Sequence, residues 1–271
     1  MFVRPGRNKA EGARANRDTM VRTCDSGVRL GSLKASPMLR MIVVFAVGAA
    51  VMQVGVLGAV RGALAQDANP YARMAPIEEY LIADQAAEVA LARSGAPASI
   101  SDDAEVMVLD RNGFKTALEG KNGFVCVVER GWGAATTDAE FWNPKIKAPI
   151  CFNAAAARSF LPIFLMKTKL VLAGKSREEI LAATNAAFEK KELPSLEPGG
   201  MCYMLSKKQY LNDRGKNWHP HLMFFVSGGD EAKSWGADAK DSPVMAGPDP
   251  EERVTVMMVW VGKWSDGSAV E

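Results

Sequence analysis

The pattern of apolar and polar residues predicts one long apolar segment near the N-terminus, followed by amphipathic helices and short strands. Residues 41–60 contain no charged side chain. Downstream, apolar residues recur at helical spacing from Pro76 to about Arg93, where Ser94-Gly95-Ala96-Pro97 is typical of a helix end. A helix over 76–93 is therefore the first element that we expect in the mature part of the chain.

Three strands are predicted directly after this helix, over 105–110, 114–119 and 124–130. Asn112-Gly113 and Asn122-Gly123 separate them. Asn and Gly both tolerate the positive φ of a tight hairpin turn, so Asn-Gly between apolar segments is a strong hairpin signal. We therefore expect a β-meander.

Three helices and three further strands complete the predicted fold. Residues 131–153 read as a loop, and Asn153 is a suitable cap for a helix over 154–160. Pro162 can open a helix that Gly174 ends, and Ser176 with Glu179 forms a capping box for a third helix ending near Lys191. The later strands are expected at 201–205, 221–226 and 254–261, with a long polar loop over 227–252.

This order predicts an α+β fold: a mainly antiparallel sheet of about six strands, with about four helices packed on it. Helices and strands fall in separate groups along the chain, which is typical of that class. No internal repeat divides residues 66–271. We expect them to form a single soluble domain.

The N-terminal pattern is typical of an export signal. Arg40 precedes the apolar segment 41–60, and Ala63-Leu64-Ala65 follows it. A positive flank, an apolar segment and an Ala-x-Ala site form a secretory signal peptide, which we place at 38–65. A retained anchor is the alternative, because twenty helical residues span roughly 30 Å. Either way, contact with a membrane is expected only through 41–60, and in the first case only before cleavage.

Residues 1–37 form a basic leader that is long for a signal peptide. Met38 and Met41 are alternative starts of translation, in which case the leader is not translated. The competing interpretation is a basic tail on the cytoplasmic side of the membrane. We favour the later start.

Charge argues against a nucleic-acid partner. The first 65 residues hold ten of the 33 Lys and Arg and three of the 31 Asp and Glu, so they carry +7 and the remainder carries −5. A weakly acidic domain lacks the basic surface that displaces counterions from phosphate backbones. Other partners and the oligomeric state are not indicated by the sequence.

Three cysteines lie downstream of the signal: Cys126, Cys151 and Cys202. Export would place them in oxidising surroundings, where one pair can close and one thiol is left over. All three pairings are open, and Cys126–Cys151 is the one that we favour. A cysteine nucleophile is a weaker alternative, since it needs a base within reach and a thiol in an apolar strand is unreactive.

The two histidines are the only candidate metal ligands with a defined spacing. His219 and His221 flank Pro220, and residues i and i+2 of an extended segment point to the same side. Imidazole binds Zn²⁺, Cu²⁺ and non-haem iron, so a divalent metal is a possible cofactor. The alternative to a metal site is that His219 is exposed to solvent and His221 forms a hydrogen bond to a neighbouring loop. Candidates for a third ligand are Cys202, Tyr203, Asp213 and Glu129.

Tryptophan and methionine suggest weaker hypotheses. Loop tryptophans can form a platform for sugars or peptides, although they also commonly plug a core. The candidates are Trp132, Trp142, Trp218 and Trp235. The methionines of the later strands, Met201, Met204, Met223, Met257 and Met258, are best explained by core packing, with Cu(I) binding as the alternative. The sequence has no Gly-x-Ser-x-Gly, phosphate loop, dinucleotide fingerprint or zinc-protease motif.

The order of elements, Gly-Phe-Val-Cys at 123–126 and Trp-His-Pro-His-Leu-Met-Phe-Phe at 218–225 resemble exported bacterial proteins with no assigned activity. The resemblance covers most of residues 70–268. It implies export to the periplasm or outside the cell, and it implies no reaction.

Two functions are therefore expected. The first is a non-enzymatic exported protein that binds a ligand or associates with the cell envelope. The second is a small metal-dependent enzyme built around His219 and His221. Neither the reaction nor the ligand follows from the sequence.

Overall fold

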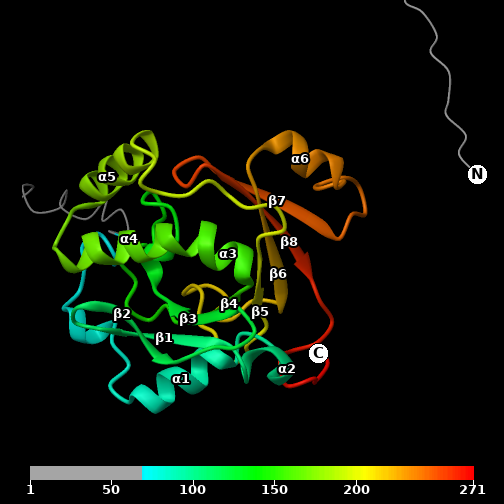
Figure 1. The fold of residues 1–271 in the computed structure, drawn as a ribbon, viewed down its shortest axis with the longest axis horizontal. Coiled ribbons are helices and arrows are strands. Elements are labelled where there is room, and N and C mark those ends of the chain that lie inside the picture. Colours follow the sequence, from blue (N-terminus) through cyan, green and yellow to red (C-terminus); the bar gives the residue numbers. More distant parts are fainter. Residues whose placement is uncertain (1–68) are drawn as a thin grey trace, which may run out of the picture. The chain divides into compact units, whose positions relative to one another are not determined.

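An eight-stranded mixed sheet runs through the part of the chain that the computed structural model describes, residues 69–271. The strand order is β2-β1-β3-β4-β5-β6-β8-β7 (Figure 1). The strands are β1 Glu105–Asp110, β2 Gly113–Leu118, β3 Val125–Glu129, β4 Ala148–Phe152, β5 Met201–Met204, β6 His221–Val226, β7 Val244–Asp249 and β8 Val254–Trp260.

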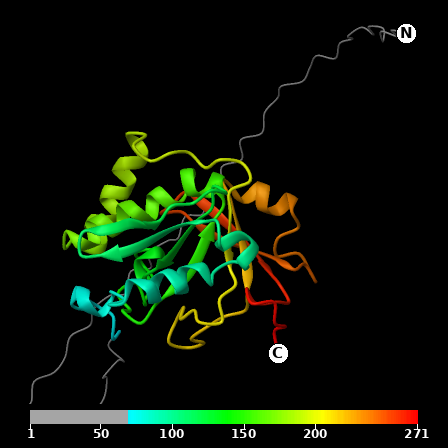
Figure 2. The same cartoon turned by 60° about the horizontal axis from the view of Figure 1, so that its bottom comes forward.

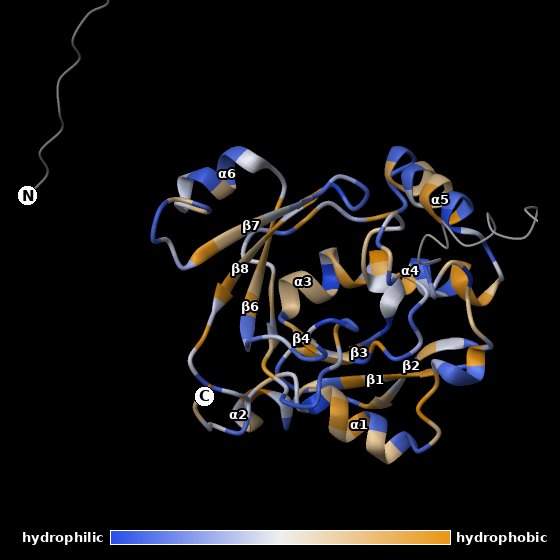
Figure 3. Cartoon of the chain, turned by 180° about the vertical axis from the view of Figure 1, so that it is seen from behind, coloured by the Kyte–Doolittle hydropathy of each residue, from blue (hydrophilic) through white to orange (hydrophobic). Residues whose placement is uncertain are grey.

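Helices cover both faces of this sheet, as Figure 2 shows from a second direction. They are α1 Gln85–Arg93, α2 Ala98–Ser101, α3 Ala154–Ser159, α4 Leu161–Leu172, α5 Arg177–Glu189 and α6 Gly229–Ser234, with short 3₁₀ turns η1 Ile77–Glu79 and η2 Gly131–Gly133. Helices α3, α4 and α5 lie over one face of the sheet, and α1 and α2 lie over the opposite face. The interior strands are mainly apolar, whereas α5 and α6 carry polar residues on their outer sides (Figure 3).

The α+β class and the local signals of three helices are confirmed. Asn153 caps α3 by accepting a hydrogen bond from the Ala156 amide at 3.0 Å. The capping box of α5 is complete, because Ser176 accepts from the Glu179 amide while Glu179 accepts from the Ser176 amide. Gly174 follows α4 with a φ of 72°. These features follow from nearest neighbours in the sequence, which is why the sequence predicts them.

The prediction of one helix over 76–93 is wrong in its first half. The segment folds as η1 and then α1, which begins only at Gln85. Asp84 interrupts the helical pattern: its backbone is extended, and its side chain accepts a hydrogen bond from the Ala86 amide at 2.9 Å. A short acidic side chain competes with the helix for backbone groups in this way and favours a helix start.

The predicted β-meander is also wrong. The β1–β2 hairpin forms as expected, but β3 pairs with the other side of β1 and runs parallel to it. After β2 the chain crosses the beginning of β1 at Gly120, where an added Cβ would lie 2.2 Å from the Glu105 amide nitrogen. Glycine at this position permits the crossing, so the second Asn-Gly follows a crossover instead of forming a hairpin.

Two strands that contain proline lie in segments for which the sequence predicts loops. Strand β4 is fully buried in the centre of the sheet and includes Pro149, and β7 forms one edge and includes Pro248. Proline cannot donate to a β-ladder, which normally argues against a central strand. The sheet therefore has eight strands and is mixed, and six helices are present within residues 69–271.

Cys126 and Cys151 form a disulfide between directly opposed residues of β3 and β4. Both lie on the α1 side of the sheet, in a cluster with Ala92 and Val106. Cys202 is a free, buried thiol on the other face, where burial raises its pKa well above the ordinary value. The pairing that we favoured is thus the one that the structure contains.

The predicted leader over 1–37, the signal peptide over 38–65 and its apolar segment 41–60 lie outside the described residues. Residues 69–271 belong to one compact unit. Within them, no helix combines the length and apolar character that crossing a bilayer requires.

Candidate functional site

The candidate site lies on the face of the sheet that α3, α4 and α5 cover. Successive residues of a strand point to opposite faces. Val127 contacts the core under these helices, whereas Cys126 and Val128 contact the core under α1. Glu129 follows the same alternation and points to the α4 side, at the end of β3. Its direct neighbour across the ladder is Ala148 of β4.

Ala148 leaves space next to this carboxyl, and a cavity of about 250 Å³ opens there. Most of its wall is apolar and comes from the sheet and the start of α4. Six of the lining residues are Ile146, Ile150, Phe160, Phe164, Met223 and Phe225. The cavity is larger than the roughly 150 Å³ that accepts benzene in an engineered protein and smaller than most drug-binding pockets.

Glu129 is the unusual side chain in this wall. The side chain is partly exposed, and it lines the cavity. Within residues 69–271, the carboxyl takes no hydrogen bond from any donor. Burial raises the pKa of Glu129 to about 8, and the Glu252 carboxyl contributes to this shift, while the Lys167 ammonium opposes it. Glu129 is therefore mainly protonated at neutral pH.

Glu252 and Lys167 form a buried ion pair beside the cavity. The Lys167 Nζ donates to Glu252 Oε1 at 2.8 Å and to the Ala134 carbonyl at 2.7 Å. Both side chains are at most 6 % exposed. Burial raises the pKa of Glu252, and the adjacent ammonium opposes the rise. The positive charge of Lys167 is thus already engaged by one carboxylate.

The turn between β7 and β8 forms one side of the cavity and is attached to the loop that precedes β4. Glu251 accepts hydrogen bonds from the Thr136 amide at 2.7 Å and from its hydroxyl at 3.0 Å. Asp249, which also lines the cavity, accepts from the amides of Glu251 and Glu252. These contacts fix the position of Glu252 opposite α4.

Arg130 borders the same cavity, but its guanidinium points to the other face of the sheet. It donates to Glu88 Oε1 at 2.9 Å and to the Tyr80 carbonyl at 2.7 Å. A third bond joins it to the Val128 carbonyl. Both members of the Arg130–Glu88 pair are buried almost completely. The Arg130 guanidinium thus pairs with Glu88 and does not neutralise Glu129.

The chain matches no protein-family model, no curated protein and no solved structure. The chemistry of the site therefore has to come from its own residues. Among the described residues that line the cavity, none is Ser, Thr, Cys, Tyr, His or Lys. The wall offers an apolar surface and carboxyl groups, a combination that is common in ligand sites.

The two histidines lie elsewhere, at the start of β6. Pro220 directly precedes this strand, as its missing amide hydrogen predicts. His221 is buried, its Nδ1 lies 2.7 Å from the His219 carbonyl, and burial lowers its pKa. Its ring packs against Trp218, whereas the exposed ring of His219 stacks on Trp260.

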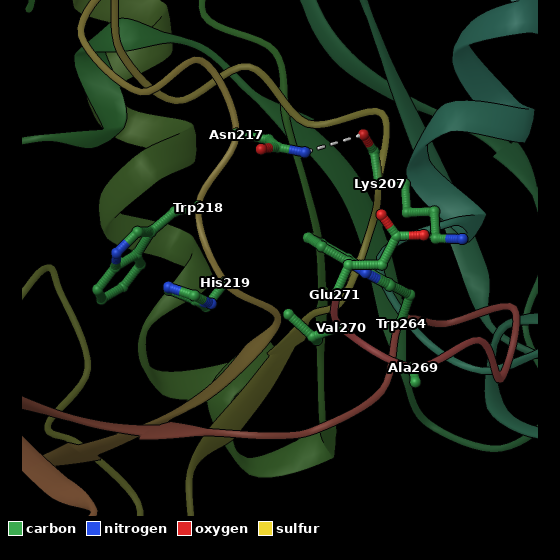
Figure 4. Close-up of a pocket in the computed structure, with 8 residues that line it drawn as sticks. All are labelled: Lys207, Asn217, Trp218, His219, Trp264, Ala269, Val270 and Glu271. Carbon is green, nitrogen blue, oxygen red and sulfur yellow. Dashed lines mark hydrogen bonds between the residues drawn. The ribbon is translucent and has the colours of Figure 1, made fainter.

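His219 and Trp218 border an open groove of about 510 Å³. Figure 4 shows them on one side of the groove, with Trp264, Val270 and Glu271 on the other side. Among residues 69–271, no group of three or more His, Cys, Asp or Glu is arranged to hold a metal ion. A metal site at His219 and His221 stays a prediction.

The four candidate third ligands are dispersed. Tyr203 packs against Phe124 on the α1 side. Cys202 belongs to the core under α4, and Glu129 lines the cavity. Asp213 lies at the surface, where hydrogen bonds from Tyr210 and other donors lower its pKa. The structure does not bring these four side chains together with the histidines into one cluster.

The tryptophans do not form a single platform. Trp132 and Trp142 are buried in the core, and the Trp132 ring nitrogen donates to Thr168. Trp235 is exposed beside α6, where it packs against Phe224. The methionines mainly pack in the sheet, as expected, and Met204 and Met223 line the cavity.

In the sequence, Glu129 is only one of four candidate third ligands, and no local pattern predicts the cavity. The available signal was the alternation in Val125–Glu129, which places an acidic residue on the same side as Val127. Lys167 gives a similar signal, since it lies on a helix whose other buried residues include Ile163, Phe164 and Val171. Glu252 gave none, because its segment reads as a polar loop.

Proposed function

We propose that the chain is an exported, non-enzymatic protein that binds a small, largely apolar molecule in the cavity beside Glu129. The observation that carries this proposal is the combination of an apolar cavity with one carboxyl group that lacks a partner among the described residues. Ligand sites commonly pair an apolar wall with a few polar groups that fix the orientation of the ligand.

Export is supported by the N-terminal pattern and by the Cys126–Cys151 disulfide, since disulfides persist mainly in oxidising compartments. The cavity would accept a molecule of roughly ten non-hydrogen atoms, judged against benzene in a smaller cavity. Binding would replace weakly held water by apolar contacts and would leave the carboxyl facing the polar end of the ligand.

A cavity-filling variant tests this function. Ala148→Leu places three extra carbons opposite Glu129, and Ala186→Leu makes the same change on the exposed side of α5. In calorimetric titrations with 2-phenylethanol at pH 6, we expect saturable binding of one molecule by the wild type and by Ala186→Leu, and none by Ala148→Leu.

Ala134→Leu, in the loop that borders the cavity, gives an independent check if Ala148→Leu folds poorly by near-ultraviolet circular dichroism. Binding that persists in both folded cavity variants would place the ligand elsewhere. An absence of binding by the wild type would refute the proposed function.

A further inference from the structure

We infer that the ligand of this cavity is an amphiphilic monocation, an apolar molecule with a single protonated amine that pairs with the Glu129 carboxylate. This inference rests on the proposed function and adds the chemical class of the ligand. It follows from the balance of charged groups around the cavity and from the position of the unpaired carboxyl.

The charges around the cavity are unequal in number. Glu129 and Glu252 both approach it. Among residues 69–271, Lys167 is the ammonium group that acts on both glutamates, and it already donates to Glu252 and to the Ala134 carbonyl. Asp249 adds a third acidic group to the wall. Two backbone amides already donate to the Asp249 carboxylate. With both glutamates ionised, the cluster therefore has one glutamate carboxylate that no cation or amide of the described residues engages, and this group can accept an additional positive charge.

Basic side chains near the cavity cannot supply that charge. Arg130 is bound to Glu88 and to backbone carbonyls on the opposite face of the sheet. A carboxylate that is partly withdrawn from water and has no partner is costly, so Glu129 binds a proton when no other cation is present. A proton and an ammonium group are thus alternative occupants of the same carboxyl.

The local geometry leaves one side of Glu129 open to the cavity. An added Cβ on Gly133 would lie 2.9 Å from Glu129 Oε2, so the loop closes one side of the carboxyl. Ala148 lies opposite on the neighbouring strand and fills little space. An amine that enters from the apolar side can therefore reach the carboxylate while its hydrocarbon part contacts Phe164 and Met223.

Binding of the cation must release the proton from Glu129, so the affinity should depend on pH. The titratable and charged groups that approach Glu129 are Glu252 and Asp249 on the β7–β8 turn, Lys167 on α4 and Cys202 on β5. Cys202 stays a neutral thiol, because burial and the Glu129 charge both raise its pKa. Glu129 itself, with a pKa of about 8, is the group that titrates between pH 6 and 8.

Two probes of the same shape test the inference: 2-phenylethylamine and 2-phenylethanol, which differ only in an ammonium group in place of a hydroxyl. For the wild type at pH 8 we expect the amine to bind at least tenfold more tightly than the alcohol. Its affinity should fall by about tenfold per pH unit as Glu129 becomes protonated below pH 8. The alcohol should show little dependence on pH.

Glu129→Gln should remove both the preference for the amine and its pH dependence, while binding of the alcohol persists. Glu119→Gln, at an exposed position, is the matched control and should behave as the wild type. Equal binding of both probes by the wild type at pH 8 would overturn the cationic ligand and leave the binding cavity in place. If neither probe binds, the proposed function fails as well.

Discussion

Glu129 shows how the position of a residue in a strand changes its chemistry. The pKa of a glutamate side chain in water is about 4.3. At the inward-facing end of β3, burial and the nearby Glu252 raise the pKa of Glu129 to about 8. The folded protein therefore holds a proton at neutral pH that the unfolded chain releases.

The first prediction concerns stability and pH. Between about pH 4.3 and 8 the folded state binds this proton and the unfolded state does not. The contribution of protonated Glu129 to the free energy of unfolding is therefore complete below about pH 4.3 and is lost as the pH rises towards 8. Wild-type stability relative to Glu129→Gln should fall by up to about 1.4 kcal/mol per pH unit in this range. Urea denaturation at pH 5, 6.5 and 8 measures it. A difference that stays constant with pH would show that Glu129 is already ionised.

A second prediction at this scale concerns the buried pair on the opposite face. Glu88→Gln removes the charge that balances Arg130, whose guanidinium is enclosed by the core. Loss of one member of a buried pair leaves an unpaired charge and typically costs about 3–5 kcal/mol. Urea denaturation should show a loss of this order. Glu197→Gln, which breaks the exposed pair with Arg158, should have a much smaller effect.

The helices and strands differ in how far the sequence predicts them. Ser176 with Glu179, Asn153 and Gly174 act on backbone groups only a few residues away, so their roles are visible in the sequence. Strand β4 depends instead on partners that lie far away along the chain. Its pairing with β5 covers only Cys151 and Phe152, so Pro149 lies outside that ladder. No local signal reveals this arrangement.

The same distinction applies to the candidate site. Alternation along β3 predicts which way Glu129 points, but the cavity needs Ala148, Phe164 and the β7–β8 turn to come together. These segments are brought together by strand order, and the sequence pattern predicted a different order for β1, β2 and β3. The candidate site is therefore less predictable from the sequence than the fold class is.

The third prediction tests the crossover at Gly120. Gly120→Ala would place a methyl group 2.2 Å from the Glu105 backbone nitrogen, so the crossing chain must move away from β1. We expect a loss of about 1–3 kcal/mol or more, as for other overpacked sites. Gly262→Ala is the matched control, because its Cβ would meet no atom within 4 Å. Equal midpoints of urea denaturation for the two variants would contradict the crossover.

For the molecule as a whole, the disulfide is the one covalent link between distant parts of the described chain. It joins residues that are 25 positions apart and encloses the loop that carries Trp132 and Trp142. A cross-link of this length reduces the conformational freedom of the unfolded chain and is worth about 3 kcal/mol in the chain-entropy model.

The fourth prediction follows from that link. Urea denaturation in the presence of dithiothreitol should show wild-type stability lower by about 3 kcal/mol than under oxidising conditions. The double variant Cys126→Ala with Cys151→Ala should be insensitive to the reductant, and Cys202→Ala should respond like the wild type. If dithiothreitol leaves the wild-type stability unchanged, even when the protein has been fully unfolded in its presence, the two thiols are not linked.

The disulfide also fixes the register of β3 and β4, the two strands that form the cavity wall at Glu129. Cys126 faces Cys151 in the same ladder in which Glu129 faces Ala148, three residue pairs further along. A slip of one residue between paired strands would turn every side chain of one strand to the other face. A covalent bond between opposed residues forbids that slip. Every molecule that contains the disulfide therefore presents the Glu129 carboxyl to the same cavity, even where the surrounding side chains pack loosely.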